Sequence, residues 1–454
     1  MQNKSFCCKI IDVSFLKKRF KNMEVLNLEN SLHKKFSPLV IDQSYDVAVV
    51  GGGLAGVMAA VAAAREGKKV ILVEKYGYLG GMATAGLVYP FMRHTENGSQ
   101  KPANAGLYFQ LLKEIYEIGG SDGEESRHYK EEFMKIVLDR MTKRYGIQVL
   151  FHAKLCSAER NDRKIQSITV ATVSGKITIS AKIFVDATGN ADLCAFAGLP
   201  YEQGRPEDGL CQPMTLCFRL GNVDWSRFDH AAANALYREF QAQGKIKNPR
   251  EDILIFHHPV GNMMHMNTTR AFGFDPTNVL EVTQAEMLLR EQVLEMYNFM
   301  KENIPGLENC ELLSSGAESG IRESRRIVGL VQITSDDLIN TRKFEDSIAR
   351  GTYAIDIHNP SGTGTYLYKM PPNDYYTIPY RALVPKDADN MIAAGRNICT
   401  THEALAAVRI MPITTCMGEA AGIAAAMAID AGTSMAEINV QDLRKKITAY
   451  GGLV

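Results

Sequence analysis

The chain has 454 residues, too many for one small core, so we expect two closely connected domains, with three as the alternative. Hydrophobic residues at 46% and charged residues at 22% are typical of a globular protein and exclude long disordered or fibrous segments. Basic and acidic residues number 51 each, so the formal net charge is zero, which disfavours a nucleic-acid partner. No apolar run reaches the roughly 18 residues that span a bilayer, and we expect no transmembrane segment.

The nine cysteines are scattered along the chain and form no C-x-x-C pair. This spacing excludes a disulfide framework and a cysteine-rich zinc or iron–sulfur site, and it favours a reducing, cytoplasmic location. Residues 1–40 carry a basic excess, with charges interrupting every apolar stretch, so we expect an N-terminal extension and not a secretion signal.

The first motif is a predicted β-α-β unit over residues 45–75. A valine-rich run at 46–50 predicts a buried parallel strand, and an alanine-rich stretch after it predicts a helix that ends at Gly67. A second apolar strand at 70–73 ends in Glu74. The turn between the first strand and the helix has G-x-G-x-x-G spacing, which is typical of dinucleotide-binding domains.

Each residue of this motif has a physical role. Gly51 permits the tight turn, Gly53 lets the backbone approach a pyrophosphate, and Gly56 lets helix and strand pack closely. The N-terminus of the helix neutralises the phosphates. Glu74 is placed to accept hydrogen bonds from ribose hydroxyls, and its charge disfavours the 2′-phosphate of NADP.

A glycine-rich loop follows at residues 75–86, and a nicotinamide-binding domain does not need one. Such a loop lets the main chain pass close to a larger cofactor with a ribityl chain and an isoalloxazine ring, which favours FAD. The alternative is an ordinary surface turn.

Three later segments fit the same sheet. Residues 181–190 and 390–397 read as strands that end in Ala187-Thr188-Gly189 and in Gly395-Arg396, and a small-residue helix runs over 412–431. Between them, expected strands at 214–220, 253–256 and 327–334 and a helix at 283–302 predict an inserted α+β domain. The fold class is therefore α/β, with a discontinuous Rossmann-like parallel sheet at 41–200 and 385–454 and a substrate or cap domain at 201–384.

On these motifs the chain resembles the FAD-dependent oxidoreductases of the glutathione-reductase-like superfamily, in particular bacterial members without an assigned substrate. The resemblance covers about residues 44–432. Its motifs are Gly51–Gly56, Glu74, 79–81, 186–189, 321–329, 378–381, 394–396 and 401–404.

The resemblance implies the following contacts to FAD. The pyrophosphate lies against Gly51, Gly53, Ala55 and Gly56. The adenosine lies against Glu74, Lys75, Thr188, Gly189 and the backbone at Ala153 or Lys154, in a strand at 148–156. The flavin and ribityl chain lie near Gly81, Met82, Thr84, Gly395, Arg396 and Met411.

Candidate catalytic residues are polar side chains in motifs that approach the flavin. Arg322 could hold a substrate carboxylate, or it could form a surface salt bridge with a neighbouring glutamate. His358 lies in a polar loop and would suit a general base, or it could be satisfied by backbone groups. Tyr380, Arg381 and His402 lie in segments that lead toward the FAD domain. We expect no metal site, because His257 and His258 fall on opposite faces of a strand.

The chain has no cysteine pair for a dithiol relay and no second G-x-G-x-x-G after a strand. Electrons must therefore pass directly between the flavin and a substrate or an external acceptor that is not identified. The sequence favours an FAD-dependent enzyme that transfers hydride between a small polar molecule and flavin N5, in either direction. The alternatives are an electron-transfer or redox-sensing subunit without a substrate and, disfavoured by the charge, an RNA-modifying enzyme. The oligomeric state stays open, a homo-oligomer being one option.

Overall fold

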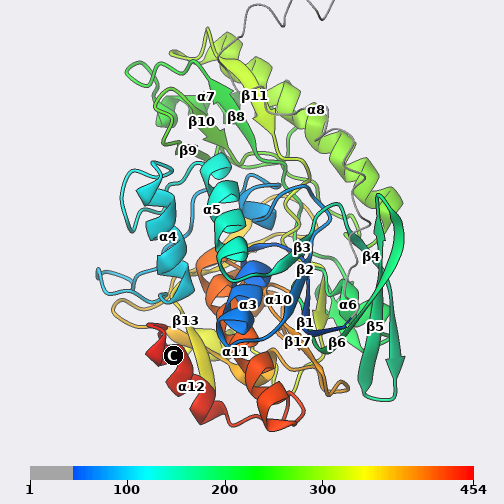
Figure 1. Cartoon of the computed structure of the whole chain (residues 1–454). Coiled ribbons are helices and arrows are strands. Elements are labelled where there is room, and N and C mark those ends of the chain that lie inside the picture. Colours follow the sequence, from blue (N-terminus) through cyan, green and yellow to red (C-terminus); the bar gives the residue numbers. More distant parts are fainter. Residues whose placement is uncertain (1–43) are drawn as a thin grey trace, which may run out of the picture. The chain divides into compact units, whose positions relative to one another are not determined.

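A computed structural model of the chain describes residues 44–454. The predicted extension at 1–40 lies outside the described residues. At the start of the described part, β1 (Ser44–Val50), α3 (Leu54–Arg65) and β2 (Val70–Val73) form the expected β-α-β unit (Figure 1). The two strands are parallel, with Val47 opposite Val70 and Val50 opposite Val73. All four residues of β2 are buried, which is why this strand is apolar throughout.

Within the described residues, seven strands form the main sheet, in the order β3-β2-β1-β6-β5-β4 with β17 also beside β6. The long strand β6 (Gly175–Asp186) runs parallel to β1 and to β17 (Met391–Ala393). Because β17 follows the whole inserted region in sequence, the parallel part of the sheet is discontinuous. The predicted α/β fold class is confirmed.

The strand predicted at 148–156 is wrong in one respect. The structure divides it into β3 (Gln148–Leu150) and β4 (Lys154–Asn161), which lie at opposite ends of the sheet. The chain turns at His152, whose φ is 52°, and the Ala153 N–H donates to the Glu74 carbonyl. The turn ends the parallel pairing with β2, so β4 pairs antiparallel with β5 (Lys164–Thr172) instead.

Helix α3 packs against α11 (Met411–Ala431) beside the sheet (Figure 1). The two helices approach closely because small residues face each other: a Cβ at Gly418 would lie 2.1 Å from the Ala55 carbonyl oxygen. By length and composition α11 could cross a membrane, contrary to the expectation from the sequence, but 89% of its apolar window is buried within the described part of the chain.

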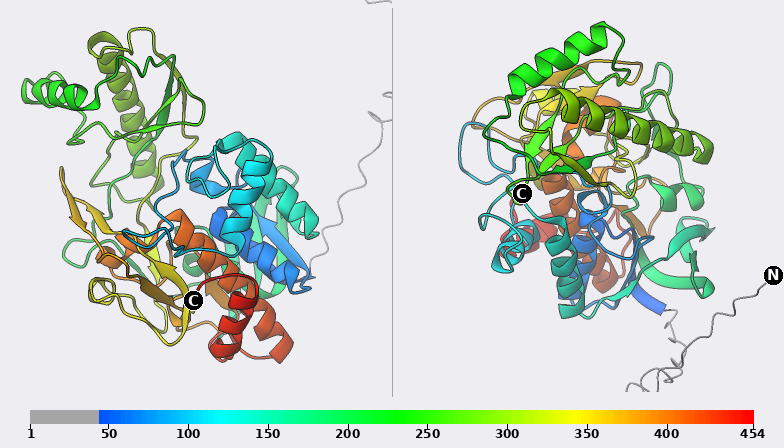
Figure 2. Two further views of the ribbon diagram at one scale, coloured as in Figure 1. Left: turned by 90° about the vertical axis from the view of Figure 1, so that its left-hand side faces the viewer. Right: turned by 90° about the horizontal axis from the view of Figure 1, so that it is seen from above.

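The inserted region has its own antiparallel sheet, in the order β11-β8-β10-β9, and two helices that cover it (Figure 2). These elements share a hydrophobic core built from residues between Met214 and Cys310. The expected helix and two of the expected strands are present with shifted ends. The strand expected at 327–334 is instead a short strand at 325–327 that pairs with β7. The elements are β7 (Tyr201–Gln203), β8 (Phe218–Gly221), β9 (Ile255–His257), β10 (Met264–Met266), β11 (Glu311–Ser315), β12 (Arg325–Ile327), α7 (His230–Ala242) and α8 (Val279–Asn303).

Two hairpin-like strand pairs follow, and they pack away from the core of the insert. β13 (Ser347–Gly351) pairs with β16 (Tyr376–Pro379) and packs on α11, whereas β14 (Ile355–His358) pairs with β15 (Thr365–Tyr368) and packs on α10 (His402–Val408). The remaining elements are η1 (Gly81–Ala83), α4 (Leu107–Glu117), α5 (Glu131–Arg144), α6 (Asp192–Phe196), α9 (Ser335–Ile339), η2 (Tyr380–Ala382) and α12 (Val440–Ala449).

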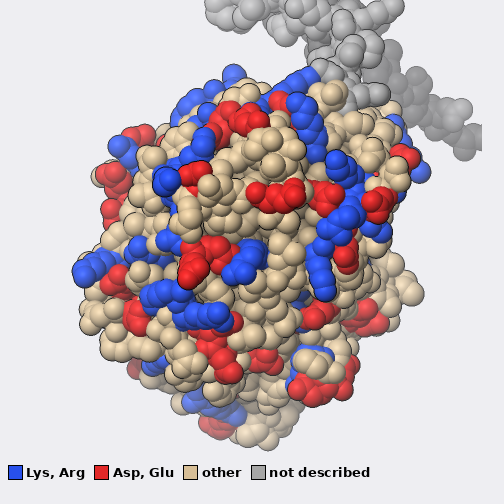
Figure 3. Space-filling view, turned by 90° about the horizontal axis from the view of Figure 1, so that it is seen from below, with Lys and Arg blue, Asp and Glu red and all other residues tan. Residues whose placement is uncertain are grey.

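The chain has equal numbers of basic and acidic residues, and both kinds are mixed on the protein surface. On the face in Figure 3, lysine and arginine side chains are interspersed with aspartate and glutamate. Many of them form short-range ion pairs, such as Lys343 with Asp374 at 2.7 Å.

Candidate active site

In the turn between β1 and α3, there is open space beside Gly53 but none beside Gly51 or Gly56. A Cβ at Gly51 would lie 2.4 Å from the Ala187 carbonyl oxygen, and one at Gly56 would lie 1.8 Å from the Gly51 carbonyl oxygen. A Cβ at Gly53 would meet nothing closer than the Gly81 Cα, at 3.9 Å. Packing within the protein therefore requires Gly51 and Gly56, whereas the space in front of Gly53 remains for a cofactor.

This space faces the N-terminus of α3. Gly53 is the N-cap, no side chain caps the helix, and its first turn has no acidic residue. The N–H groups of the first turn, which includes Ala55, are therefore free to bind an anion such as a pyrophosphate. The turn therefore offers open space and main-chain donors for a phosphate group.

Glu74 lies at the end of β2, where the sequence predicted a ribose contact. Its Oε2 accepts from the Gly52 N–H at 2.7 Å and its Oε1 from the Tyr76 N–H at 2.8 Å. Each oxygen keeps a further lone pair for a hydroxyl group. Burial raises the pKa of this carboxyl. Lys75 instead reaches across to Glu318 of the insert, with which it forms an ion pair.

The glycine-rich loop at residues 75–86, which was predicted to lie beneath the flavin, packs against the turn between β1 and α3 (the phosphate turn). The Gly80 N–H donates to the Gly52 carbonyl at 2.8 Å, and a Cβ at Gly81 would lie 2.8 Å from the Gly53 Cα. The Thr84 hydroxyl is buried and donates to the Leu79 carbonyl at 2.8 Å, so it stabilises the loop and is not presented to a ligand.

Arg396 joins the FAD-domain loops to the insert. Its guanidinium donates to the carbonyls of Gly189 and Ile321, both at 3.0 Å. Burial lowers the pKa of Arg396 to about 10, so it stays charged at neutral pH. The Thr188 hydroxyl donates to Asp186 at 2.7 Å.

The Thr188 N–H also donates to Asp186, and the Gly189 carbonyl accepts from Arg396, so these groups already have partners within the protein. Lys154, the first residue of β4, is exposed. The N–H group of Ala153 beside it is already used by Glu74, so an adenine contact at this point would have to come from other main-chain groups. The predicted contacts of these residues with FAD stay predictions.

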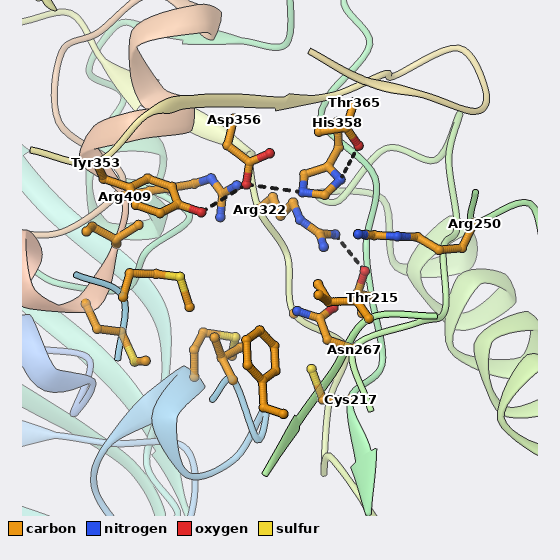
Figure 4. A pocket seen from close by; sticks show the side chains of 18 of the residues that line it. Thr215, Cys217, Arg250, Asn267, Arg322, Tyr353, Asp356, His358, Thr365 and Arg409 are labelled. Carbon is orange, nitrogen blue, oxygen red and sulfur yellow. Dashed lines mark hydrogen bonds and ion pairs between the residues drawn. The ribbon is translucent and has the colours of Figure 1, made fainter. Parts of the chain in front are cut away.

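A cavity of about 610 Å³ opens between the insert, the β14–β15 hairpin and the N-terminus of α11 (Figure 4). Met82 and Met411, two of the residues predicted near the flavin, line it together with Arg396. Its apolar side is formed by Met82, Val88, Pro90, Met92, Leu254, Phe256, Ile410 and Met411. The cavity therefore adjoins the elements expected to hold the flavin.

Arg322 forms part of the polar side of this cavity. Its Nη1 donates to the Pro213 carbonyl at 2.7 Å and to the Thr215 hydroxyl at 2.6 Å, which fixes the guanidinium (Figure 4). Burial, with a smaller effect from nearby Arg409, lowers the pKa of Arg322 to about 9. The group stays charged at neutral pH, and the salt bridge to a neighbouring glutamate considered from the sequence is not formed.

Asp356 lies opposite Arg322 and accepts a hydrogen bond from the Tyr353 hydroxyl at 3.1 Å (Figure 4). Burial alone would raise the pKa of this carboxyl, but His358 and the charges of Arg409 and Arg322 hold it well below its ordinary value. Asp356 is therefore ionised. Burial raises the pKa of Tyr353, which keeps its hydroxyl protonated as a donor.

His358 lines the cavity, as its prediction as a catalytic residue required. Its Nδ1 lies 3.1 Å from the Arg270 guanidinium, which can only donate, so the ring proton sits on Nε2, 3.7 Å from Asp356. Burial, with the charge of Arg322, lowers the pKa of His358 well below its ordinary value. The imidazole is a neutral donor here, and we do not carry the general-base role into the proposal below.

The structure does not bring three predicted catalytic residues to this cavity. The Tyr380 hydroxyl is buried and donates to the Met435 carbonyl at 2.7 Å. Arg381 is half exposed and pairs with Asp346 at 2.9 Å. Both residues belong to the turn at η2, which packs toward the C-terminal segments and not toward the insert.

His402 is buried, with its Nδ1 2.6 Å from Glu323. It lines a second cavity of about 430 Å³, together with Ile357 and Tyr366. Because side chains alternate along a strand, β14 and β15 present Asp356 and His358 to the first cavity and Ile357 and Tyr366 to the second. The hairpin therefore separates His402 from the polar side described above.

Sequence reasoning missed several residues of the polar side. Asp356 carried a usable signal, because it lies two residues before His358 on the same face of a strand. Arg409 directly follows α10, and its Nε has no hydrogen-bond partner among the described residues. Arg250, Thr215 and Asn267 carried no signal, since only tertiary packing brings these loops together.

The histidines weighed as metal ligands have other partners. His258 lies 3.2 Å from Glu131 and His265 contacts Arg219, whereas the His257 ring stacks on Trp225. The contact between His258 and Glu131 ties the insert to α5.

Solved structures with similar folds have low identity to this chain. A geranylgeranyl bacteriochlorophyll reductase-like protein from Thermoplasma acidophilum is 15% identical, with 90% of this chain and 84% of that chain covered and a TM-score of 0.44. A flavoprotein/dehydrogenase from Cytophaga hutchinsonii is 14% identical, with 90% and 86% covered and a TM-score of 0.43. A myxobacterial chondrochloren halogenase is 14% identical, with 89% and 78% covered and a TM-score of 0.39. With TM-scores this low, none of these likenesses bears on the function of this chain.

No curated protein matches the chain. The family model described as FAD dependent oxidoreductase matches residues 46–447, which include the phosphate turn, the insert and the N-terminus of α11. The match agrees with the open space at Gly53 and the uncapped helix behind it. The chain belongs to the FAD dependent oxidoreductase family; it is an enzyme, and its cofactor is FAD.

Proposed function

We propose that the enzyme transfers hydride between a carbon atom of a small polar organic molecule and FAD, and that the molecule binds in the 610 Å³ cavity. One observation supports this most strongly. The cavity has elements expected to hold the flavin, Met82 and Met411, along one side and a buried polar cluster from the insert and β14 along the other. When bound, FAD supplies the redox chemistry, with flavin N5 as the atom that exchanges hydride.

The polar cluster is suited to orienting a substrate. The Asp356 carboxylate accepts hydrogen bonds, the Tyr353 hydroxyl and the His358 Nε2–H donate them, and Arg322 supplies a fixed positive charge. Each of the four side chains has a partner within the protein, so its position is set before a substrate arrives. Such preorganisation lowers the barrier by holding the reacting groups in a productive geometry.

The apolar side excludes water from the reacting carbon. A second binding motif for a nicotinamide cofactor is missing from the sequence, so we propose that an external acceptor or donor exchanges electrons at this same flavin. Within the superfamilies of flavin enzymes, the glycine turn and Glu74 support a place in the glutathione-reductase-like group. The reducing character inferred from the scattered cysteines supports a cytoplasmic location.

The experiment uses the purified, FAD-loaded enzyme without oxygen. A library of small polar metabolites is added one by one while the oxidised-flavin absorption band is followed, and the proposal predicts that at least one metabolite bleaches it. The variant Asp356→Asn should retain FAD and slow bleaching by about 10-fold or more, because the substrate loses an ionised acceptor. Asp374→Asn, which alters a surface ion pair with Lys343, serves as the matched control.

Bleaching by no metabolite, or equal rates for Asp356→Asn and the wild type, would contradict the proposal. The first result would favour the redox-sensing alternative, since such a subunit is not reduced by a small metabolite.

A further inference from the structure

We infer that the substrate is a small monocarboxylate, whose carboxylate lies against Arg322 and Arg409 while its apolar body lies along the methionine-rich side of the cavity. This inference rests on the proposed function, because it assigns the chemical class of the molecule oxidised or reduced there. Three properties of the cavity support it: its charges, its unpaired donors and its division into a polar and an apolar side.

The charges do not balance at the polar side. Among the residues that line the cavity, four are arginines and three are carboxylates: Arg250, Arg322, Arg396, Arg409, Glu251, Asp252 and Asp356. Glu251 lies 3.0 Å from Arg270, a buried arginine behind the lining, and Asp252 lies 3.2 Å from Arg250. Asp356 is therefore the one lining carboxylate left for Arg322, Arg396 and Arg409. The Arg396 guanidinium already donates to the Gly189 and Ile321 carbonyls and to the Asn190 side chain, which leaves Arg322 and Arg409 for a ligand.

Hydrogen-bond donors are also unpaired there. The Arg409 Nε is buried, and among the described residues no side chain or backbone group accepts a hydrogen bond from it. The Arg250 Nη1 is also buried without a hydrogen-bond acceptor among the described residues. A buried charged donor without a partner is unfavourable, and an anionic ligand would supply the missing acceptor. Figure 4 shows Arg409, Arg322 and Arg250 around the same space.

The charges and the free donors at the polar side favour an anion. Arg322 and Arg409 carry two positive charges, of which Asp356 neutralises one. The remaining charge matches one carboxylate, whose two oxygens fit the planar fork of a guanidinium. A dianion would place its second charge near Asp356, which is ionised. The apolar lining residues, among them Val88, Met92 and Phe256, offer apolar surface for the rest of the molecule.

The first test compares acids with neutral analogues of the same shape. Benzoate, phenylacetate and hexanoate are titrated into the FAD-loaded enzyme beside benzamide, phenylacetamide and hexanamide. Binding is measured by calorimetry and by the change in the flavin absorption spectrum, so the readout does not depend on turnover. We expect at least one acid to bind about 10-fold or more tightly than its amide, equal to about 1.4 kcal/mol.

The second test locates the carboxylate. Arg322→Gln and Arg409→Gln should each weaken binding of the acid by about 10-fold or more and change binding of the amide little. Arg381→Gln is the matched control, because it removes an arginine that pairs with Asp346 away from the cavity. Flavin content and melting temperature, measured for each variant, show whether it is folded and loaded.

The outcomes separate this inference from the proposed function. Amides that bind as tightly as acids, acids that do not bind below about 10 mM, or acid binding that Arg409→Gln leaves unchanged would overturn the carboxylate assignment. A neutral metabolite that bleaches the flavin would also overturn it and would leave the proposed reaction intact. Selective binding of acids through both arginines supports the assignment, even if no carboxylate reduces the flavin and the proposed reaction fails.

Discussion

Gly53→Ala should remove FAD while leaving the protein folded. The added methyl group would point into the open space in front of α3, where its nearest neighbour is the Gly81 Cα at 3.9 Å, an ordinary contact distance. Gly53 has φ −65° and ψ 174°, which alanine adopts without strain. The methyl group nevertheless occupies the space through which a pyrophosphate would reach the helix N-terminus.

We expect a small change in protein stability and a large change in the Kd for FAD. Replacing a glycine N-cap by alanine costs a few tenths to about 1 kcal/mol, and the smaller entropy of the unfolded chain returns about 0.4–1 kcal/mol. The melting temperature of the FAD-free protein should therefore change by no more than about 3 °C. Forcing a methyl group into the cofactor contact should cost about 2–3 kcal/mol, which is roughly 30- to 150-fold in the Kd for FAD.

The assay measures the two effects separately. Flavin released from the purified protein gives the occupancy, titration of the FAD-free protein gives the Kd, and calorimetric melting of the FAD-free protein gives the stability. Gly56→Ala is the contrasting variant, because its Cβ would lie 1.8 Å from the Gly51 carbonyl oxygen and should lower both stability and FAD binding.

Two results would refute this reasoning. If Gly53→Ala binds FAD with the wild-type Kd, the space in front of Gly53 does not hold the pyrophosphate. If the FAD-free variant instead melts as early as Gly56→Ala, the glycine is required by the fold and says nothing about a cofactor.

Three further outcomes are expected. Gly422→Ala should lower the free energy of unfolding by about 1–3 kcal/mol in chemical denaturation, because its Cβ would lie 2.2 Å from the Ala59 carbonyl oxygen; an unchanged midpoint would contradict the close packing of α3 on α11. Burial lowers the pKa of His94 from 6.5 to about 4, so the unfolded chain binds a proton that the folded chain excludes, and stability falls as the pH drops from 6.5 toward 4. His94→Asn should lose stability less steeply over that range, and a parallel pH profile would count against this. Tyr380→Phe should cost about 1 kcal/mol through the lost bond to Met435 and leave flavin reduction by substrate unchanged; slower reduction would return Tyr380 to the site.

The sequence predicted the parts of the fold that depend on local rules. The spacing of Gly51, Gly53 and Gly56 sets one turn, so the β-α-β unit and the FAD turn follow from adjacent residues. The prediction of one strand at 148–156 was wrong because the chain turns at His152. The residues around His152 mix polar and apolar types and do not indicate a turn.

The cavity could be predicted only in part. His358 and Arg322 were singled out by their polar loops, and Asp356 lies two residues before His358 on β14. Arg409 and Thr215 come from distant segments that meet these residues only through tertiary packing. Arg381 and Tyr380 lie in a motif of the resembled family, yet η2 presents them to Asp346 and Met435. A sequence motif shows which side chain is present. The direction in which that side chain points depends on the helices and strands packed around it.

The most direct test of the account is an anaerobic titration of the yellow, FAD-loaded enzyme with small carboxylates and their neutral analogues. The account predicts that a carboxylate bleaches the flavin and that Asp356→Asn and Arg409→Gln slow this bleaching while retaining FAD. Bleaching at equal rates in both variants and the wild type would place the reaction elsewhere than in this cavity.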